Sequence, residues 1–274
     1  MGLLSIDEGL CKGDELCVAD CPTAILRIDE SKGTPKMIPG GEEMCLRCGH
    51  CVAVCPHGAL DHAEVPLDGC DPVRKELTIG FEQAVQFLRS RRSVRRFKDR
   101  PVERDTLRRL IDVARCAPTA SNLQPVEWVV IDGREKVQGL AEQAVGWMRS
   151  VLAKDAQPAY APYLPRLVAA WDAGSDAVLR DAPCLVIAMA PKEAANGMVD
   201  LALALSYLEL AAPTLGLGTC WAGLLQGALL SHPPLKGKVG IPAGYPHHYP
   251  MMIGYAKPTY HRLPLRKPAK VKWD

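Results

Sequence analysis

The segment CLRCGHCVAVCP, residues 45 to 56, contains four cysteines at the spacing C-x2-C-x2-C-x3-C and ends in a proline. A second segment, CKGDELCVADCP at residues 11 to 22, has the same frame 34 positions earlier. The shift superposes four pairs of residues: Cys11 on Cys45, Cys17 on Cys51, Cys21 on Cys55 and Pro22 on Pro56. It also places Asp14 on Cys48, so a carboxylate replaces one thiol. The first ~60 residues therefore contain two copies of one unit.

Three closely spaced cysteines followed by a fourth and a proline form the thiolate pattern that holds an iron–sulfur cube. Zinc binding and coincidence are the alternatives, but zinc runs lack the trailing x3-C-P and are not duplicated in this way. In the two-cluster bacterial pattern, the fourth cysteine of each run binds the other cluster. We therefore expect one 4Fe–4S cluster on Cys45, Cys48, Cys51 and Cys21, and another cluster on Cys11, Asp14, Cys17 and Cys55. Residues 1 to 63 resemble the two-cluster bacterial ferredoxins.

Asp14 departs from that pattern and leaves three interpretations open. A carboxylate oxygen is a harder ligand for iron than a thiolate, so Asp14 could hold the fourth iron in a labile way. The corner could instead be vacant, which would give a 3Fe–4S cluster. Asp14 could also be a solvated loop residue that does not contact iron.

The composition excludes several classes of protein. The 274 residues contain 33 basic and 31 acidic side chains, so no global attraction to nucleic acid or to anionic lipid is expected. No signal peptide precedes the cysteines, and a cytoplasmic, reducing location is expected. The apolar segment from about Gly197 to Leu215 is interrupted by Asp200, Glu209 and Pro213, which favours a buried core helix over a membrane span.

The pattern changes after residues 64 to 80, which are rich in proline and glycine and indicate a linker. From Phe81 onward, helical spacing and apolar runs are mixed without regular alternation, which predicts an α+β layer fold. The expected helices cover residues 81–90, 102–117, 134–153 and 197–215, and the expected strands cover 126–132, 184–190 and 249–256. Residues 154 to 182 indicate a surface excursion, and its aromatic side chains Tyr160, Tyr163 and Trp171 are expected to cover a pocket.

Three further segments indicate a phosphate-bearing cofactor. RRSVRRF, residues 91 to 97, concentrates arginines that can pair with a phosphate. APTASNLQP, residues 117 to 125, offers hydroxyl and amide groups in a loop, and GLGTCWAG, residues 216 to 223, is interpreted as a glycine-rich turn with free N–H groups. Neither G-x-G-x-x-G after a strand nor G-x-x-x-x-G-K-[ST] is present, so a nicotinamide-binding Rossmann domain and nucleoside triphosphate hydrolysis are not supported.

In this order, the segments resemble the nitroreductase family of FMN-dependent oxidoreductases over residues 81 to 266. The resemblance implies an α+β sandwich, here in a domain of residues 81–274, that forms a homodimer with FMN at the interface. The cofactor-binding residues that it implies are Arg91, Arg92, Ser93 and Arg95 for the phosphate, ribityl chain and ring; Pro118, Thr119, Ala120, Ser121, Asn122 and Gln124 from the partner subunit; Cys220, Trp221, Ala222 and Gly223 along the isoalloxazine; and Arg266, with Lys267, at the phosphate. Trp128 lies two residues later than the family pattern places it.

The two parts together predict an oxidoreductase in which iron–sulfur clusters relay electrons to or from FMN. The flavin would reduce a small acceptor of nitroaromatic, quinone or enone type, with electrons from a ferredoxin-like carrier or from NAD(P)H. The alternative is a cluster-based redox sensor or electron-relay subunit without small-molecule turnover. No catalytic acid is evident, Cys220 is interpreted as a packing residue, and His247 and His248 are expected at the surface.

Overall fold

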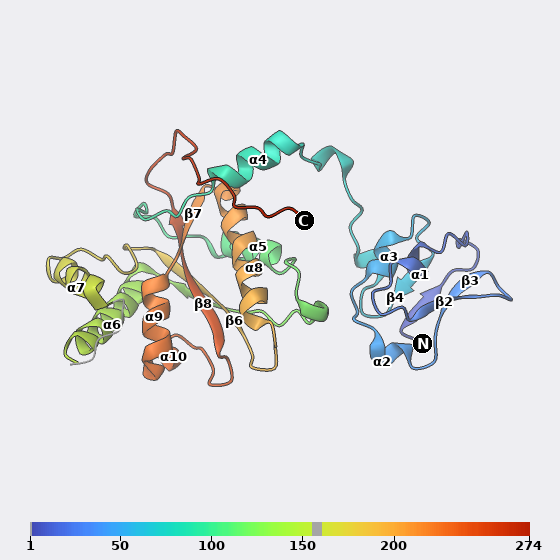
Figure 1. The fold of residues 1–274 in the computed structure, drawn as a ribbon, viewed down its shortest axis with the longest axis horizontal. Helices are drawn as coiled ribbons and strands as arrows, with labels where there is room; N and C mark the ends of the chain where they lie inside the picture. Colours follow the sequence, from blue (N-terminus) through green and yellow to red (C-terminus); the bar gives the residue numbers. More distant parts are fainter. Residues whose placement is uncertain (1, 155–160) are drawn as a thin grey trace. The chain divides into compact units, whose positions relative to one another are not determined.

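The computed structural model describes residues 2–154 and 161–274, so the predicted pocket residue Tyr160 lies outside the described residues (Figure 1). The chain divides into two compact units. The first contains Met1–Thr78 together with Ser121–Leu123, and the second contains Ile79–Ala120 and Gln124–Asp274. The boundary after Thr78 falls within the segment 64–80 that was predicted as a linker, where two short 3₁₀ turns cover Leu67–Gly69 and Lys75–Leu77.

The first unit shows the internal repeat in its secondary structure. Two antiparallel pairs form its sheets, β1 (Leu4–Ile6) with β4 (Leu60–His62) and β2 (Leu26–Asp29) with β3 (Thr34–Met37). Three short helices follow the loops, namely α1 (Leu16–Ala19), α2 (Gly41–Met44) and α3 (His50–Val54). The shift of 34 positions superposes α1 on α3 and β2 on β4. The two cysteine runs therefore occupy equivalent places in two copies of one fold.

The second unit is built around a four-stranded antiparallel sheet in the order β5-β6-β8-β7. Its strands are β5 (Glu127–Asp132), β6 (Cys184–Ala190), β7 (Leu217–Trp221) and β8 (His247–Tyr255). Its helices are α4 (Phe81–Ser90), α5 (Arg104–Ala114), α6 (Arg134–Leu152), α7 (Leu164–Asp172), α8 (Gly197–Ala211), α9 (Gly223–Ser231) and α10 (Pro233–Lys238). Short 3₁₀ turns cover Ala120–Asn122, Ala161–Tyr163 and Ala212–Leu215.

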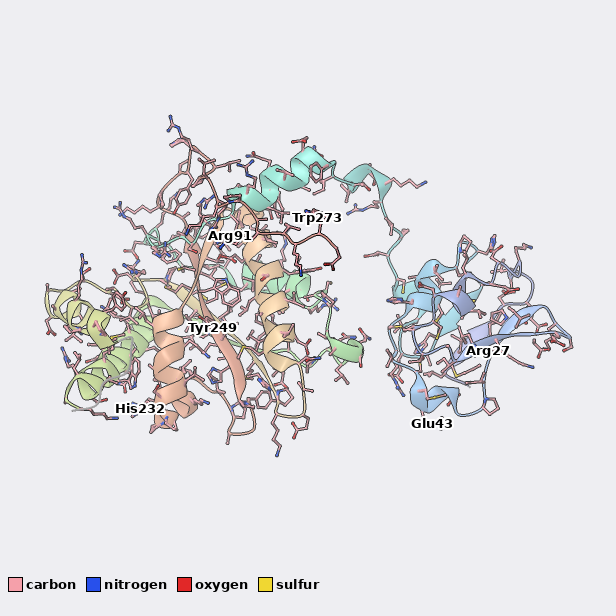
Figure 2. The ribbon with its side chains drawn as sticks, viewed as in Figure 1. Arg27, Glu43, Arg91, His232, Tyr249 and Trp273 are labelled. Atoms are coloured by element: carbon pink, nitrogen blue, oxygen red, sulfur yellow. The ribbon has the colours of Figure 1, made fainter. Side chains whose placement is uncertain are left out.

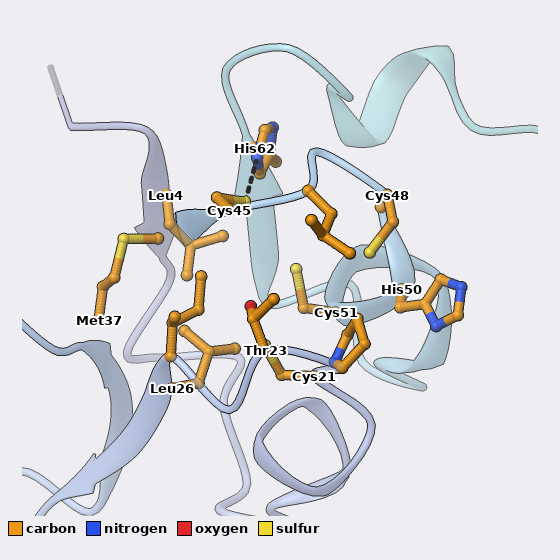
Figure 3. A pocket seen from close by; sticks show the side chains of 14 residues that line it. Leu4, Cys21, Thr23, Leu26, Met37, Cys45, Cys48, His50, Cys51 and His62 are labelled. Carbon is orange, nitrogen blue, oxygen red and sulfur yellow. Dashed lines mark hydrogen bonds between the residues drawn. The ribbon is translucent and has the colours of Figure 1, made fainter. Parts of the chain in front are cut away.

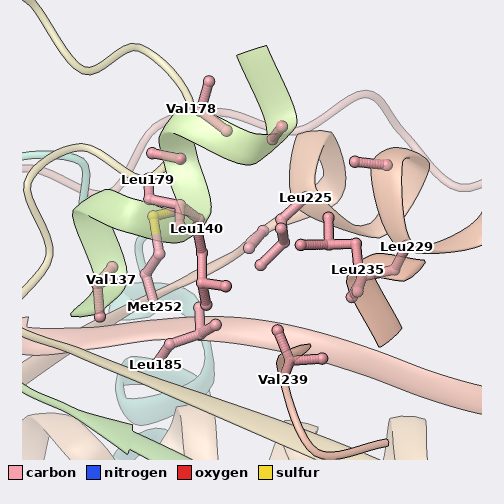
Figure 4. Packing of buried hydrophobic residues seen from close by; sticks show 14 of the residues in the cluster. Val137, Leu140, Val178, Leu179, Leu185, Leu225, Leu229, Leu235, Val239 and Met252 are labelled. Carbon is pink, nitrogen blue, oxygen red and sulfur yellow. The ribbon is translucent and has the colours of Figure 1, made fainter. Parts of the chain in front are cut away.

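Strand β6 explains why this sheet is covered on both faces. All seven residues of its CLVIAMA sequence are buried, as expected for a strand between two layers. Leu185 and Ile187 point into a core shared with α6, α7, α9 and α10 (Figure 4). Val186 and Ala188 point into the opposite core, which α5 and α8 cover. The predicted α+β sandwich is confirmed.

Helix α8 is the central element of the second core. The segment Gly197–Leu215 is long and apolar enough to cross a membrane by composition. In this fold, however, Leu201, Leu205 and Leu208 are fully buried against the sheet and α5. The apolar character of the segment therefore serves the packing of this unit, as the interrupting charges predicted.

Two interpretations of the sequence were wrong in the second unit. The segment GLGTCWAG was interpreted as a glycine-rich turn, but residues 217–221 form strand β7. A Cβ on Gly218 would lie 2.4 Å from Val94 Cγ2, so this glycine permits a close approach of two segments. His248 was expected at the surface, but it lies on β8 and is fully buried. Its Nδ1 forms a hydrogen bond of 3.1 Å with Oε1 of Gln226 on α9.

The buried His248 predicts a pH-dependent stability. Burial, together with the charges of Lys236 and His247, lowers its pKa from 6.5 to about 4. The unfolded state therefore binds a proton that the folded state rejects, so stability is complete above pH ~6.5 and decreases as the pH falls toward 4. We expect a loss of about 2 kcal/mol between pH 7.5 and pH 5, measured by urea unfolding with tryptophan fluorescence.

The matched variants are His248→Asn and, as a control, His261→Asn at an exposed position. All five tryptophans lie in the second unit, so the fluorescence reports on that unit alone. His248→Asn should flatten the pH dependence between 5 and 7.5, whereas His261→Asn should leave it unchanged. An equal slope in the wild type and in His248→Asn would contradict the assignment.

Candidate functional site

Four cysteines predicted as ligands of one cluster line a single cavity of the first unit (Figure 3). They are Cys21, Cys45, Cys48 and Cys51. Cys21 follows α1 and Cys45 follows α2, while Cys51 lies within α3. Apolar side chains such as Leu4 and Leu26 form much of the remaining wall. The structure thus brings the fourth cysteine of the first run to the three leading cysteines of the second.

The complementary set lines a second cavity. Its members are Cys11, Asp14, Cys17 and Cys55. Asp14 is therefore not an isolated loop residue, since it lies on the cavity wall with the three thiols. The Oδ2 atom of Asp14 lies 2.7 Å from Nε2 of His57, which lines the same cavity. His57 is a site residue that sequence reasoning missed, although it directly follows the proline of the second run.

The geometry of both cavities suits a polynuclear cluster better than one metal ion. Within residues 2–154 and 161–274, no three His, Cys, Asp or Glu side chains converge closely enough to share a single ion. Each cavity instead has four candidate ligands distributed around its wall. An iron–sulfur cube binds each thiolate to a different iron, so its ligands do not meet at a point.

Burial and hydrogen bonding set the proton affinity of the cysteine thiols. Burial raises the pKa of Cys51 to about 11. The charges of Cys48 and Cys45 raise it further, whereas hydrogen bonds from backbone N–H groups lower it. Burial also raises the pKa of Cys17. For Cys21, burial acts in the same direction, but hydrogen bonds from Ile25 N–H and from Thr23 lower the pKa overall. Binding of a cluster must therefore release protons from the more buried thiols.

In the second unit, the arginine-rich segment after α4 is joined to β7. Ser93 forms a parallel bridge with Thr219, and the backbone N–H of Val94 donates to the Thr219 carbonyl at 2.8 Å. Arg91 lies at the end of α4 (Figure 2) and donates to Ser93 Oγ at 3.5 Å. The structure therefore brings the RRSVR segment to the strand that ends in Cys220 and Trp221, as the resemblance implied.

A buried glutamate holds these two segments together. Glu209, on α8, accepts a hydrogen bond from Arg91 Nη1 at 3.0 Å and from Trp221 Nε1 at 3.0 Å. Its side chain is buried, and the Trp221 ring packs edge-on against Tyr249 with centroids 5.0 Å apart. Sequence reasoning used Glu209 only as an argument against a membrane span. A charge in an otherwise apolar helix was the signal that it has a buried partner.

The close approach at Gly218 gives a prediction about this arrangement. Gly218→Ala would place a methyl group 2.4 Å from Val94 Cγ2, so β7 and the arginine segment must separate. We expect a destabilisation of about 2–3 kcal/mol in urea unfolding and a lower flavin content after purification. Gly146→Ala on α6 is the control, because a Cβ at this position would meet no atom within 4 Å and alanine favours a helix. Equal stability of the two variants would contradict the prediction.

The predicted loop from Pro118 to Gln124 is fixed to α8 by a second buried acid. The backbone N–H of Ala120 donates to Asp200 Oδ1 at 3.1 Å, and Thr119 Oγ1 accepts from the N–H of Gln124. Ser121, Asn122 and Gln124 have positive φ angles, an uncommon conformation that clusters at functional sites. Asp200 Oδ2 is buried without a hydrogen-bond partner among the described residues. Asp200 is another residue that the sequence reasoning did not assign.

The remaining predicted phosphate ligands lie in different surroundings. Arg95 lines a cavity with four other cationic side chains, namely Arg96, Arg134, Arg180 and Lys257. Arg92 donates to the Arg89 carbonyl, and its buried Nε has no partner in the described part of the chain. Arg266 is exposed in the C-terminal segment, where it makes no hydrogen bond or ion pair with the described residues. The structure does not bring Arg266 into the cluster around Glu209.

An apolar cavity of about 360 Å³ adjoins the predicted flavin-lining segment. Its wall contains Trp147 from α6, Tyr163 and Leu164 at the start of α7, and Gly223, Leu224 and Gly227 from α9. Of the aromatic residues predicted to form a pocket, Tyr163 is therefore present, whereas Trp171 packs against the hydrophobic core. Cys220 is buried, and burial raises its pKa, which agrees with a packing role.

The fold and these sites define a ferredoxin-type unit joined to an α+β sandwich with a basic cofactor segment. Comparison with known sequences agrees. The model of the nitroreductase family matches residues 88–255, and that of the 4Fe-4S dicluster domain matches residues 10–59. The chain belongs to the nitroreductase family and carries an N-terminal 4Fe–4S dicluster domain.

Two curated relatives match separate parts of the chain. A protein of Methanothermobacter thermautotrophicus, which its name assigns provisionally to NADH dehydrogenase or NAD(P)H nitroreductase activity, is 26% identical over 144 residues. The match covers 51% of this chain and 60% of that protein. A polyferredoxin of Methanothermobacter marburgensis is 37% identical over 70 residues, which cover 22% of this chain and 17% of the relative.

Solved structures show the same fold at low sequence identity. A nitroreductase with bound FMN from Bacteroides fragilis aligns with a TM-score of 0.53 and 21% identity, over 69% of this chain and 95% of its own. A nitroreductase with bound FMN from Desulfitobacterium hafniense aligns with a TM-score of 0.54 and 20% identity, over 72% of this chain and 99% of its own. An iodotyrosine deiodinase bound to FMN and 3-iodo-L-tyrosine aligns with a TM-score of 0.52 and 19% identity, over 69% of this chain and 98% of its own.

Proposed function

We propose that this protein is an FMN-dependent oxidoreductase in which two iron–sulfur clusters relay electrons to or from the flavin. The flavin site reduces a small acceptor of nitroaromatic, quinone or enone type. A ferredoxin-like carrier supplies the electrons through the clusters, and NAD(P)H is the competing donor. The observation that carries the proposal is the presence, in one chain, of two cavities lined by cluster ligands and of an apolar cavity beside Gly223.

The residues of the second unit fit FMN on three grounds. Arg92 Nε and Asp200 Oδ2 are buried polar atoms without partners in the described chain, as expected where a ligand completes a site. Arg91 and Ser93 lie together at the end of α4, and Arg95 follows on the same segment. When bound, FMN exchanges electrons singly with clusters and in pairs with organic acceptors. The chain itself supplies cationic groups for a phosphate and fixes two segments through Glu209 and Asp200.

The apolar cavity supports enzyme activity over a relay or sensor role. Trp147, Tyr163 and Leu224 give it aromatic and aliphatic walls, and Gly223 leaves room at the predicted flavin segment. A concave, mostly apolar pocket of this type suits a small organic molecule. A subunit that only relays electrons between clusters needs no such cavity.

We further propose that the second unit forms a homodimer. Helix α8 buries one side in the core but exposes Val199, Leu203 and Tyr207 on the other, at positions four residues apart. Helix α4 likewise exposes Phe81 and Leu88, and none of its residues is buried. A second copy of the chain would cover these faces, and sedimentation of the purified protein measures the resulting mass.

Visible absorbance of the purified protein tests the function. Reduced ferredoxin, or NAD(P)H in a parallel sample, should bleach the flavin, and a nitroaromatic compound or a quinone should restore its colour. Restoration of the colour by an acceptor supports the proposed enzyme activity. The donor that bleaches the flavin faster indicates which class of electron donor the protein uses. Failure of every acceptor in the panel would favour the relay interpretation, and absence of flavin would overturn the proposal for the second unit.

A further inference from the structure

The cavity of the first cluster contains a histidine that neither the cysteine motif nor the proposed reaction uses. His62 is the last residue of β4, and only 1% of it is exposed. Its Nε2 lies 3.7 Å from Sγ of Cys45, a proposed cluster ligand (Figure 3). The backbone N–H of Arg47 also donates to this sulfur, at 3.4 Å.

The other ring nitrogen fixes the direction of the hydrogen bond. Nδ1 of His62 accepts from the backbone N–H of Glu64 at 3.1 Å and from that of Val65 at 3.2 Å. A ring nitrogen that accepts hydrogen bonds carries no proton, so the proton of the neutral imidazole lies on Nε2. Nε2 can therefore act toward Cys45 only as a donor.

We propose that His62 is a positioning residue that donates an N–H···S hydrogen bond to the Cys45 thiolate and raises the reduction potential of that cluster. Reduction adds negative charge to the cluster and its thiolates, so a fixed donor stabilises the reduced form more than the oxidised form. This inference rests on the proposed function, because it requires a cluster on Cys45.

The internal repeat supplies a built-in comparison. The shift of 34 positions that superposes Cys45 on Cys11 superposes His62 on Ile28. In the strand registers, His62 pairs with Leu4, which lines the first cavity, and Ile28 pairs with Pro35, which lines the second. Isoleucine has no donor, so the second site lacks the hydrogen bond at the equivalent position. The two clusters therefore differ through one side chain as well as through Asp14.

EPR-monitored redox titration of the reconstituted full chain tests the proposal. His62→Leu removes the donor, and His62→Gln retains an N–H near the position of Nε2. We expect His62→Leu to lower the reduced-to-oxidised ratio of the first cluster about tenfold at a fixed potential, which corresponds to ~59 mV for one electron. His62→Gln should restore most of this shift, and the second cluster should not change. His50→Leu is the control, because His50 lines the same cavity but pairs with Asp20 at 3.3 Å.

A second measurement keeps the proposal testable if His62→Leu does not load a cluster. In wild-type protein labelled with ¹⁵N-histidine, the reduced first cluster should show a hyperfine coupling that His62→Gln abolishes and His50→Leu retains. An unchanged potential in His62→Leu, equal shifts in both clusters, failure of His62→Gln to restore the potential, or absence of the coupling would each overturn the inference. Absence of iron from the wild type would instead overturn the proposed function itself, which an iron assay shows separately.

Discussion

Glu209→Leu is expected to produce a protein without flavin and with a less stable second unit. The carboxylate of Glu209 accepts hydrogen bonds from Arg91 and Trp221, and its removal leaves a guanidinium and an indole N–H without their partner. Loss of one member of a buried ion pair costs about 3–5 kcal/mol. Arg91 is 26% exposed at its side chain, so we expect the lower end of that range, about 3 kcal/mol. Urea unfolding and the flavin-to-protein absorbance ratio measure the two effects.

Two variants separate the charge from the shape of this residue. Glu209→Gln keeps one acceptor oxygen for two donors, so it should retain part of the stability and of the flavin. Glu82→Leu changes an exposed carboxylate in the first turn of α4 and should alter neither quantity. Full flavin content together with unchanged stability in Glu209→Leu would show that Arg91 and Trp221 do not depend on it.

Asp14 and Cys48 occupy the same position in the two copies of the repeat, and substituting either residue by the other type is expected to change the cluster in its own cavity. Asp14→Cys should give the second cavity four thiolates and convert its cluster to an ordinary 4Fe–4S form. Cys48→Asp should give the first cavity the carboxylate of the second and make its fourth iron labile, because oxygen is a harder and more easily displaced ligand. Each variant serves as the matched control of the other, since the remaining cavity is unchanged.

EPR of the oxidised protein and iron analysis measure these changes. A 3Fe–4S signal in the wild type, lost in Asp14→Cys, would show a vacant corner at Asp14. Its absence, with a full complement of iron, would show ligation through oxygen. A spectrum that Asp14→Cys leaves unchanged would mean that Asp14 does not contact iron. His57→Leu then tests whether the 2.7 Å contact between His57 Nε2 and Asp14 Oδ2 holds the carboxylate at that corner.

Local patterns in the sequence predicted much of this fold because short-range physics determines them. Helices α4 and α6 and strand β6 lie where helical spacing and the run CLVIAMA placed them. The grouping of the cysteines could also be predicted, because in the two-cluster bacterial pattern the fourth cysteine of each run joins the opposite run. The structure places Cys21 and Cys55 in this way. Strand β7 could not be identified, because Gly218 has low strand propensity and its place depends on contact with Val94.

The residues that sequence reasoning missed act through partners distant in the chain. Glu209 lies 118 positions from Arg91, and Asp200 lies 80 positions from Ala120. His62 belongs to no motif in the sequence, and only the approach of its ring to Cys45 indicates the proposed role. His248 was misplaced because a Pro/Tyr-rich neighbourhood indicates a loop, whereas the residue lies on β8 opposite Met189 of β6. Side chains of this kind are determined by tertiary packing, which no local pattern contains.

Helix α8 connects flavin binding in the second unit with the association of two copies of the chain. Asp200 and Glu209 flank the buried stripe of this helix and fix the two segments proposed to hold FMN, while its opposite face exposes Val199, Leu203 and Tyr207. One rigid element therefore belongs both to the cofactor site and to the surface that a second copy would cover. Association and flavin binding are then thermodynamically linked, so each must strengthen the other by the same factor. Dilution of the protein should release flavin, and added FMN should shift the subunits toward the dimer.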